Sequence, residues 1–169
     1  MLQWASSCRS ARSAVVVALL GVLGMLILSL SCAREGPSDQ ALRERFFAHR
    51  SEFDQLLAMA ESDSGVGRIA PDFFDPTTGI TDKRWDQYRS LFQKLGLERG
   101  ITIASDRVVL ITSAEGMFSA GSSKGYVHSA TRLEPLVPSL DEFPDASESN
   151  VPSYAPLADN WYLFLQWGD

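Results

Sequence analysis

The sequence predicts an α+β domain in which two N-terminal helices pack on one face of a small antiparallel sheet. Before residue 96, apolar residues recur at three- and four-residue spacing over two stretches, which is the period of an amphipathic helix. After Gly100 the apolar residues are mostly β-branched or aromatic and stand in short runs between turn residues, as they do in strands. Because helices come first and strands follow, we expect the helices to be segregated on one face of the sheet.

The N-terminal 31 residues have the layout of a secretory signal peptide. Arg9 and Arg12 are the only charged residues before an uninterrupted apolar or small run from 14 to 31. A basic start followed by such a run is typical of a signal. The run is also close to the roughly 17 to 25 residues of a spanning helix, so its length alone leaves signal peptide and membrane anchor open.

The end of this run carries the most specific motif in the chain. Residues 28–32 read Leu-Ser-Leu-Ser-Cys. A small residue directly before a cysteine, at the end of an apolar run, resembles the lipobox of bacterial lipoproteins. The commonest form of that motif has leucine at the position of Ser29. The resemblance implies cleavage after Ser31, a diacylglycerol on the thiol of Cys32, and a further acyl chain, of the palmitate type, on the new amino group.

The same resemblance predicts where the protein resides. In Gram-negative lipoproteins an aspartate after the lipidated cysteine favours the inner membrane, and here that residue is Ala33. We therefore expect a lipid-anchored protein at the periplasmic face of the outer membrane. The expected organisation is a signal peptide over 1–31, the lipidated cysteine and a polar tether over 32–40, and a single domain over 41–169. Cys8 lies in the removed part, so the lipidated Cys32 leaves no thiol for a disulfide.

The first helix is predicted to start at residue 39 and to fade between residues 62 and 67. Ser38 can cap it, and Asp39 follows in the first turn, where the helix dipole favours a carboxylate. The residues on its apolar stripe are Leu42, Phe46, His49, Phe53, Leu56 or Leu57, and Ala60. A histidine on such a stripe predicts a half-buried packing residue.

The second helix is predicted over 82–95, with Asp82 as its cap. Its apolar stripe consists of Trp85, Tyr88, Phe92 and Leu95. Gly96 suits the left-handed position after a helix, with Leu97 contacting Phe92. The stretch 61–81 between the helices is predicted to be an irregular loop, held to the core by Phe73 and Phe74.

The remaining chain predicts strands joined by loops. The runs 101–104 and 108–113 flank a turn near Asp106 and form an expected hairpin, and 126–128 is a third strand. The stretch 132–156 is rich in proline, serine and acids, which predicts a loop. The final run, 161–167, is apolar on both faces, so we expect a strand covered on both sides. If one face of the sheet were left uncovered, Tyr162 and Phe164 could form an exposed aromatic surface that binds a partner.

Two glycine motifs have catalytic or cofactor-binding counterparts. Residues 65–70 fit G-x-G-x-x-A, but a helix precedes them and Pro71 follows, whereas dinucleotide binding needs a strand before and a helix after. Residues 121–125 fit G-x-S-x-G, with Ser123 in the nucleophile position. His128, the only later histidine, is five residues away, which is beyond hydrogen-bond reach in an extended chain. A flexible turn and a hairpin turn are the favoured readings.

Neither the histidines nor the loop aspartates have the spacing of a metal site. His49 and His128 are the only histidines and form no zinc motif. Asp72, Asp75 and Asp82 could gather around Ca²⁺, but they lack the spacing of a calcium loop and suit caps and turns. We therefore expect no metal and no cofactor.

Charge is distributed unevenly along the chain. The net charge is −6, which argues against nucleic-acid binding because phosphate contacts need clustered Lys and Arg. From residue 133 onward there are seven acids and no base. This stretch is read as a solvated loop, with an acidic face for a basic partner or a cation as the alternative. The seven acids are Glu134, Asp141, Glu142, Asp145, Glu148, Asp159 and Asp169.

The functional prediction is an envelope lipoprotein with a small binding or structural domain and no recognisable catalytic site. Its expected partners are the membrane, through lipid on Cys32, and a protein. The alternative from another class is a membrane-tethered hydrolase that uses unrecognised carboxylates or Ser123, with His128 or the loop aspartates. A deep pocket that holds His128, or Asp72 and Asp75, together with perturbed acids would favour the enzyme, whereas a flat sheet with exposed aromatics would favour binding.

Overall fold

The computed structural model describes residues 36–76, 78–115, 121–142 and 151–167. The predicted signal peptide, Cys32 and the next three residues of the tether lie outside these residues. The helices are α2 (Asp39–Ala48), α3 (Arg50–Ser62) and α4 (Asp82–Leu95). The strands are β1 (Arg68–Ile69), β2 (Phe74–Asp75), β3 (Gly100–Ile103), β4 (Arg107–Glu115), β5 (Ser122–Ser129), β6 (Ser153–Ala158) and β7 (Trp161–Trp167). Within the described ranges, no helix has both the length and the apolar character needed to cross a membrane.

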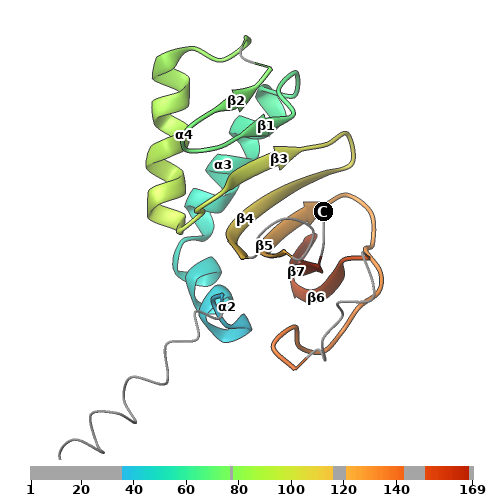
Figure 1. Ribbon diagram of the computed structural model, residues 1–169. Coiled ribbons are helices and arrows are strands. Elements are labelled where there is room, and N and C mark those ends of the chain that lie inside the picture. The colour runs from blue at the N-terminus through green and yellow to red at the C-terminus, as the bar shows by residue number, and fades with distance from the viewer. Residues whose placement is uncertain (1–35, 77, 116–120, 143–150, 168–169) are drawn as a thin grey trace, which may run out of the picture. The chain divides into compact units, whose positions relative to one another are not determined.

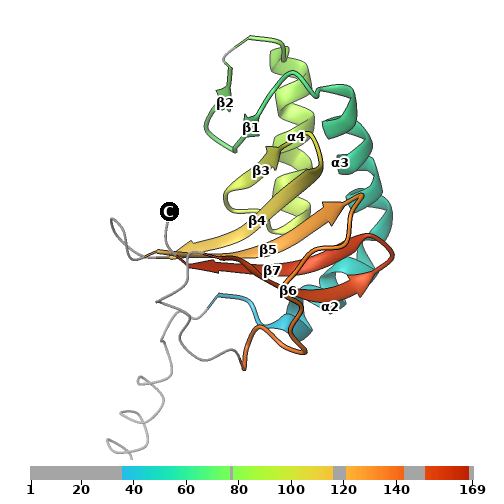
Figure 2. The same cartoon turned by 90° about the vertical axis from the view of Figure 1, so that its right-hand side faces the viewer.

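The strands form one seven-stranded sheet in the order β2-β1-β3-β4-β5-β7-β6, and all neighbours are antiparallel. The helices lie on one face of this sheet, with α3 beside α4 (Figures 1 and 2). The α+β class, the early helices and their segregation on one face of an antiparallel sheet are as predicted. Because a strand has period two, each strand presents alternate residues to the helices.

The predicted first helix is two helices, separated at His49. Ser38 caps α2 as expected, since its Oγ accepts from the N–H of Ala41 at 3.2 Å. His49 leaves helical geometry with φ −125° and ψ 30°. Neither proline nor glycine stands at the break, so tertiary packing rather than local propensity accounts for it. Phe46 and Phe53, one on each helix, both contact the ring of Trp161.

The second helix has the predicted bounds but a different cap. Thr81, not Asp82, caps α4, because its Oγ1 accepts from the N–H of Arg84 at 3.2 Å. Asp82 lies one position inside, where its charge still favours the helix N-terminus. At the other end Gly96 has φ +65°, and the N–H of Leu97 donates to the carbonyl of Phe92 at 2.8 Å. This is the predicted C-terminal stop.

Three segments predicted as loops or turns contain strands. The stretch 61–81 holds β1 and β2, two-residue strands too short to give a period-two signal. Residues 122–125, expected in a hairpin turn, belong to β5. The loop predicted over 132–156 ends in β6, whose Pro156 is tolerated because β6 is an edge strand. Phe74 packs on Trp85 as expected, but Phe73 is 49% exposed and does not reach the core.

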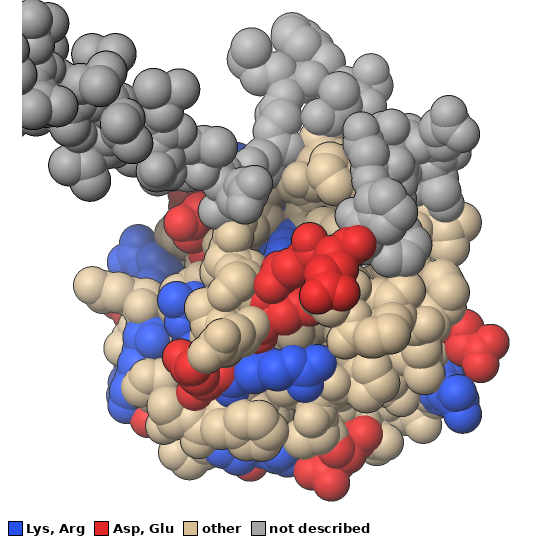
Figure 3. Space-filling view, turned by 90° about the horizontal axis from the view of Figure 1, so that it is seen from below, with Lys and Arg blue, Asp and Glu red and all other residues tan. Residues whose placement is uncertain are grey.

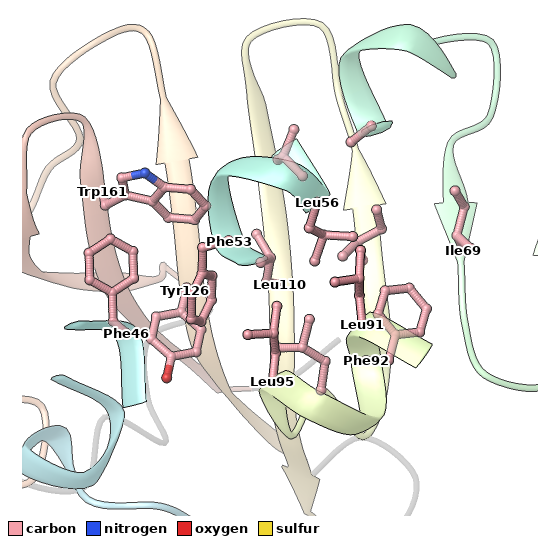
Figure 4. Close-up of a cluster of buried hydrophobic side chains, with 14 of the residues drawn as sticks. Phe46, Phe53, Leu56, Ile69, Leu91, Phe92, Leu95, Leu110, Tyr126 and Trp161 are labelled. Atoms are coloured by element: carbon pink, nitrogen blue, oxygen red, sulfur yellow. The ribbon is translucent and has the colours of Figure 1, made fainter. Parts of the chain in front are cut away.

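The sheet separates two apolar clusters. The larger lies between sheet and helices, where the rings of Phe46, Phe53, Tyr126 and Trp161 meet (Figure 4). The smaller lies on the opposite face and is covered by the segment after β5. Its buried members are Ile111, Val127, Leu133, Tyr154 and Phe164. Strand β7 is therefore covered on both sides, as its composition predicts, and Phe164 is buried rather than exposed to a partner.

Candidate functional site

A cleft around His128 is the clearest candidate site among the predicted functional residues. It lies where the C-terminal part of α3, the β3–β4 turn and the end of β5 meet, and its volume is about 410 Å³. We call it the His128 cleft. Its polar lining comes from Glu61 and Ser64 near the end of α3, from Ser105 to Arg107 at the turn, and from His128 on β5. The remaining lining is largely aliphatic.

The geometry holds the imidazole in one orientation. His128 pairs with Val108 and Trp161 in the sheet, and its ring packs on the indole of Trp161 at 5.0 Å between ring centroids. Burial lowers the pKa of His128 below its ordinary 6.5, while the charge of Glu61 partly opposes that shift and Arg50 adds to it. Neutral imidazole can accept or donate a hydrogen bond to a ligand at neutral pH.

Of the other charged residues in the His128 cleft, Asp106 and Arg107 form an ion pair at 2.6 Å, whereas Glu61 is exposed and has no ion-pair partner among the described residues. Among the same residues, neither ring nitrogen of His128 forms a hydrogen bond, so the imidazole is not paired with a nucleophile. The arrangement is suited to hydrogen bonding with a partly apolar ligand.

Ser123, the predicted alternative nucleophile, is not brought to His128. Both lie on β5, and five residues of alternation put their side chains on opposite faces of the sheet. In the sheet register Ser123 lies beside Ala114 and Gln166, whereas His128 lies beside Val108 and Trp161. The Ser123–His128 pair is therefore wrong as a catalytic unit, and the G-x-S-x-G letters describe a strand rather than a nucleophile elbow.

The two remaining motifs are the glycine pattern at 65–70, which the sequence predicts to be a turn, and the loop aspartates, which it predicts to serve in caps and turns. Gly65 and Gly67 lie in the turn between α3 and β1, with no strand before them. In the described part of the chain, no three His, Cys, Asp or Glu residues are grouped closely enough to hold a metal ion. Asp72, Asp75 and Asp82 are all exposed around the β1–β2 region.

A buried ionic cluster, which the sequence analysis missed, joins the start of α2 to the sheet. The ammonium of Lys124 lies 2.8 Å from Asp39 Oδ1 and 2.5 Å from Asp141 Oδ1. Asp39 Oδ2 also accepts from the N–H of Leu140 at 2.6 Å and from Ser139 Oγ at 3.2 Å. We call Asp39, Lys124 and Asp141 the Lys124 cluster. It fixes the first turn of the domain to β5 and to the segment before residue 142.

Opposing effects set the protonation of Asp39. Burial raises the pKa of its carboxyl, but contact with the Lys124 ammonium and the hydrogen bond from Leu140 together outweigh that effect. The pKa of Asp39 therefore lies below its ordinary 3.8, and the carboxylate is charged at neutral pH. Nearby, the hydroxyl of Tyr126 donates to the carbonyl of Leu42 at 3.0 Å, which adds a second link between α2 and β5.

Three of the four described acids after residue 133 lie within ion-pair distance of a base, and the fourth, Glu142, is exposed. Glu134 lies 3.5 Å from Arg132, and Asp159 lies 3.2 Å from Arg50. Asp141 belongs to the Lys124 cluster. On the face seen from below, acidic and basic side chains lie side by side (Figure 3). Asp145, Glu148 and Asp169 lie outside the described residues.

The pKa of His128 offers a direct test of the cleft. We expect NMR titration of its ring protons to give a pKa below 6.5, because burial disfavours the charged form. Glu61→Gln should lower this pKa further, and Arg50→Gln should raise it. The unfolded chain then takes up a proton before the folded chain, so folding loses stability as the pH falls through 6.5. A pKa above 6.5, or one that neither variant moves, would contradict this arrangement.

A scan against protein-family models and searches of curated proteins and of solved structures found no match to this chain.

Proposed function

We propose that this chain is an envelope lipoprotein, held at the periplasmic face of the outer membrane by lipid on Cys32, whose domain acts by binding. The lipobox-like residues 28–32 carry the anchoring part, and α2 begins at Asp39, seven residues after Cys32. Seven residues span at most about 25 Å. A lipid at Cys32 would therefore keep the domain next to the bilayer. A protein or small-molecule ligand of the domain would then be bound close to the membrane surface.

The first turn of the domain is built to withstand such attachment. Asp39 is the first residue of α2 and is held by Lys124 and by the N–H of Leu140. Because Lys124 links Asp39 to β5, a pulling force on the tether would be carried by this central strand, and the first turn of α2 would not unwind alone. Two or more acyl chains would make the attachment effectively permanent, since each buried methylene contributes about 0.8 kcal/mol.

The His128 cleft supports binding over the alternative of a tethered hydrolase. Acyl-transfer chemistry needs a nucleophile within hydrogen-bond reach of its base. Ser123 lies on the opposite face of β5, and Asp106, the carboxylate at the turn, is engaged by Arg107. Ser64 and Ser105 also line the cleft, but neither is hydrogen-bonded to His128. A cleft with an aliphatic part and separate polar groups suits recognition.

Lipidation is tested by labelling with a palmitate analogue in a Gram-negative host. The wild-type chain should incorporate label and be processed, whereas Cys32→Ala should lose the label completely and accumulate unprocessed precursor. Cys8→Ala is the matched control, because it removes the other cysteine from the segment that is cut away, and it should label normally. Normal labelling of Cys32→Ala would overturn the anchoring proposal.

A further inference from the structure

A second cleft lies near the opposite edge of the sheet from β6. Its walls are Arg68 on β1, residues 70–73 of the β1–β2 turn, and Glu98 and Arg99 just before β3. Its volume is about 390 Å³. We call it the Arg68 cleft. It shares no lining residue with the His128 cleft.

The guanidinium of Arg68 is held in place without being neutralised. Its Nη1 donates to Thr102 Oγ1 and its Nη2 to the carbonyl of Arg99, both at 2.9 Å. Both acceptors are uncharged oxygens, and the Nε–H is buried with no partner. Burial lowers the pKa of Arg68 and the charge of Arg99 lowers it further, while the charge of Asp72 partly opposes both effects. Such a preorganised guanidinium loses little conformational freedom when it binds an anion.

The four ionic side chains that line the Arg68 cleft are unpaired. Within the described ranges, no carboxylate lies within ion-pair distance of Arg68 or Arg99, and neither Asp72 nor Glu98 contacts a base. Elsewhere in the domain Arg84 pairs with Asp63 at 2.8 Å. The lining thus offers two guanidinium groups and two carboxylates, none of which is in a direct ion pair with another described residue.

We propose that the Arg68 cleft binds a small organic monocarboxylate with an apolar body. A planar guanidinium fork matches the two oxygens of a carboxylate. Asp72 and Glu98 disfavour anions of higher charge, such as phosphate esters, because those would bring a second negative charge toward them. Pro71 and the half-exposed ring of Phe73 supply an apolar lip for the rest of the ligand. This inference is independent of the lipid anchor.

The test is calorimetric titration of the full-length chain in non-ionic detergent, with phenylacetate as the probe. Wild type should bind phenylacetate with a Kd of about 1 mM or tighter, and inorganic phosphate at least about 10-fold more weakly. Arg68→Gln should weaken phenylacetate binding about 10-fold or more. Arg99→Gln removes an exposed charge whose side chain forms no hydrogen bond or ion pair with the described residues, so it should weaken binding several-fold while leaving the fold intact.

Two further variants make the result specific. Lys83→Gln removes an exposed, unpaired cation that does not line the cleft, and its affinity for phenylacetate should equal that of wild type. Asp72→Asn should raise the affinity for phosphate relative to phenylacetate, because one of the two repelling carboxylates is gone. The proposal is overturned if wild type does not bind phenylacetate, if phosphate binds as tightly, or if neither arginine variant weakens binding.

Discussion

Replacing Lys124 with methionine is expected to lower the free energy of unfolding by about 3–5 kcal/mol at neutral pH. The methionine keeps the length of the apolar stem but removes the cation between two carboxylates. Asp39 would then keep its negative charge in a site where its side chain is only 9% exposed. Removing one partner of a buried pair costs far more than the pair contributes, because the other charge is left uncompensated. Guanidinium unfolding followed by tryptophan fluorescence measures the loss.

The pH dependence of this loss separates charge from packing. In wild type the pKa of Asp39 lies below 3.8, so the stability it contributes is present above that pH and is lost as the pH falls through the folded-state pKa. Without Lys124, its hydrogen bond and charge no longer oppose the effect of burial, so the pKa of Asp39 rises above its wild-type value. The difference between wild type and Lys124→Met should therefore shrink between pH 7 and about pH 3, as Asp39 becomes protonated. An equal loss at both pH values would show that the lysine stem, not its charge, matters.

Three further variants calibrate the effect. Lys94→Met removes a lysine that is 53% exposed and pairs with Glu52, so it should leave the unfolding midpoint unchanged. Asp141→Asn should cost less than Lys124→Met, because Asp141 is 40% exposed and water can replace its contact. Adding Asp39→Leu to Lys124→Met should recover part of the lost stability, since no buried charge then remains.

The sequence predicts those elements whose apolar pattern lasts more than a turn or a few alternations. Helix α4 and strand β7 have the bounds that their patterns indicate, and Gly96 ends α4 as expected. The break at His49 could not be predicted, because it depends on where Trp161 meets two phenylalanines from separate helices. Strands β1 and β2 could not be predicted either, since two residues define no period.

The candidate sites are harder to predict than the fold because they combine distant residues. His128 meets Glu61 only when the end of β5 lies against the C-terminal part of α3. Arg68 meets Arg99 only through the pairing of β1 with β3. Lys124 did leave a signal: once β5 is extended to Ser122, Lys124 shares a face with Tyr126, which places a lysine on the core side of a strand. Reading residues 121–125 as a turn concealed that signal.

Gly125 in the same strand carries the second large effect, and Gly125→Ala is expected to destabilise the domain by about 3 kcal/mol or more. Gly125 lies opposite Ile111, where β4 is interrupted by a bulge before Ser113. A Cβ at Gly125 would lie 2.0 Å from the carbonyl oxygen of Leu110 and 3.0 Å from the N–H nitrogen of Thr112. Both atoms belong to backbone that the sheet holds, so no side-chain movement relieves the clash.

Gly65→Ala is the matched control for this substitution. Nothing lies within 4 Å of a Cβ built on Gly65, and its backbone is not left-handed, so the change should be within about 0.5 kcal/mol or slightly stabilising. Guanidinium unfolding of both variants makes the comparison, and equal midpoints would mean that the bulge is not packed against Gly125 as described.

Gly125 stands between Lys124 and His128 on β5. A shift of β4 away from Gly125 would therefore disturb both the Lys124 cluster, which holds α2, and the His128 cleft, which lies beside α3. We therefore expect Gly125→Ala to move the pKa of His128 toward 6.5 as well as to lower stability.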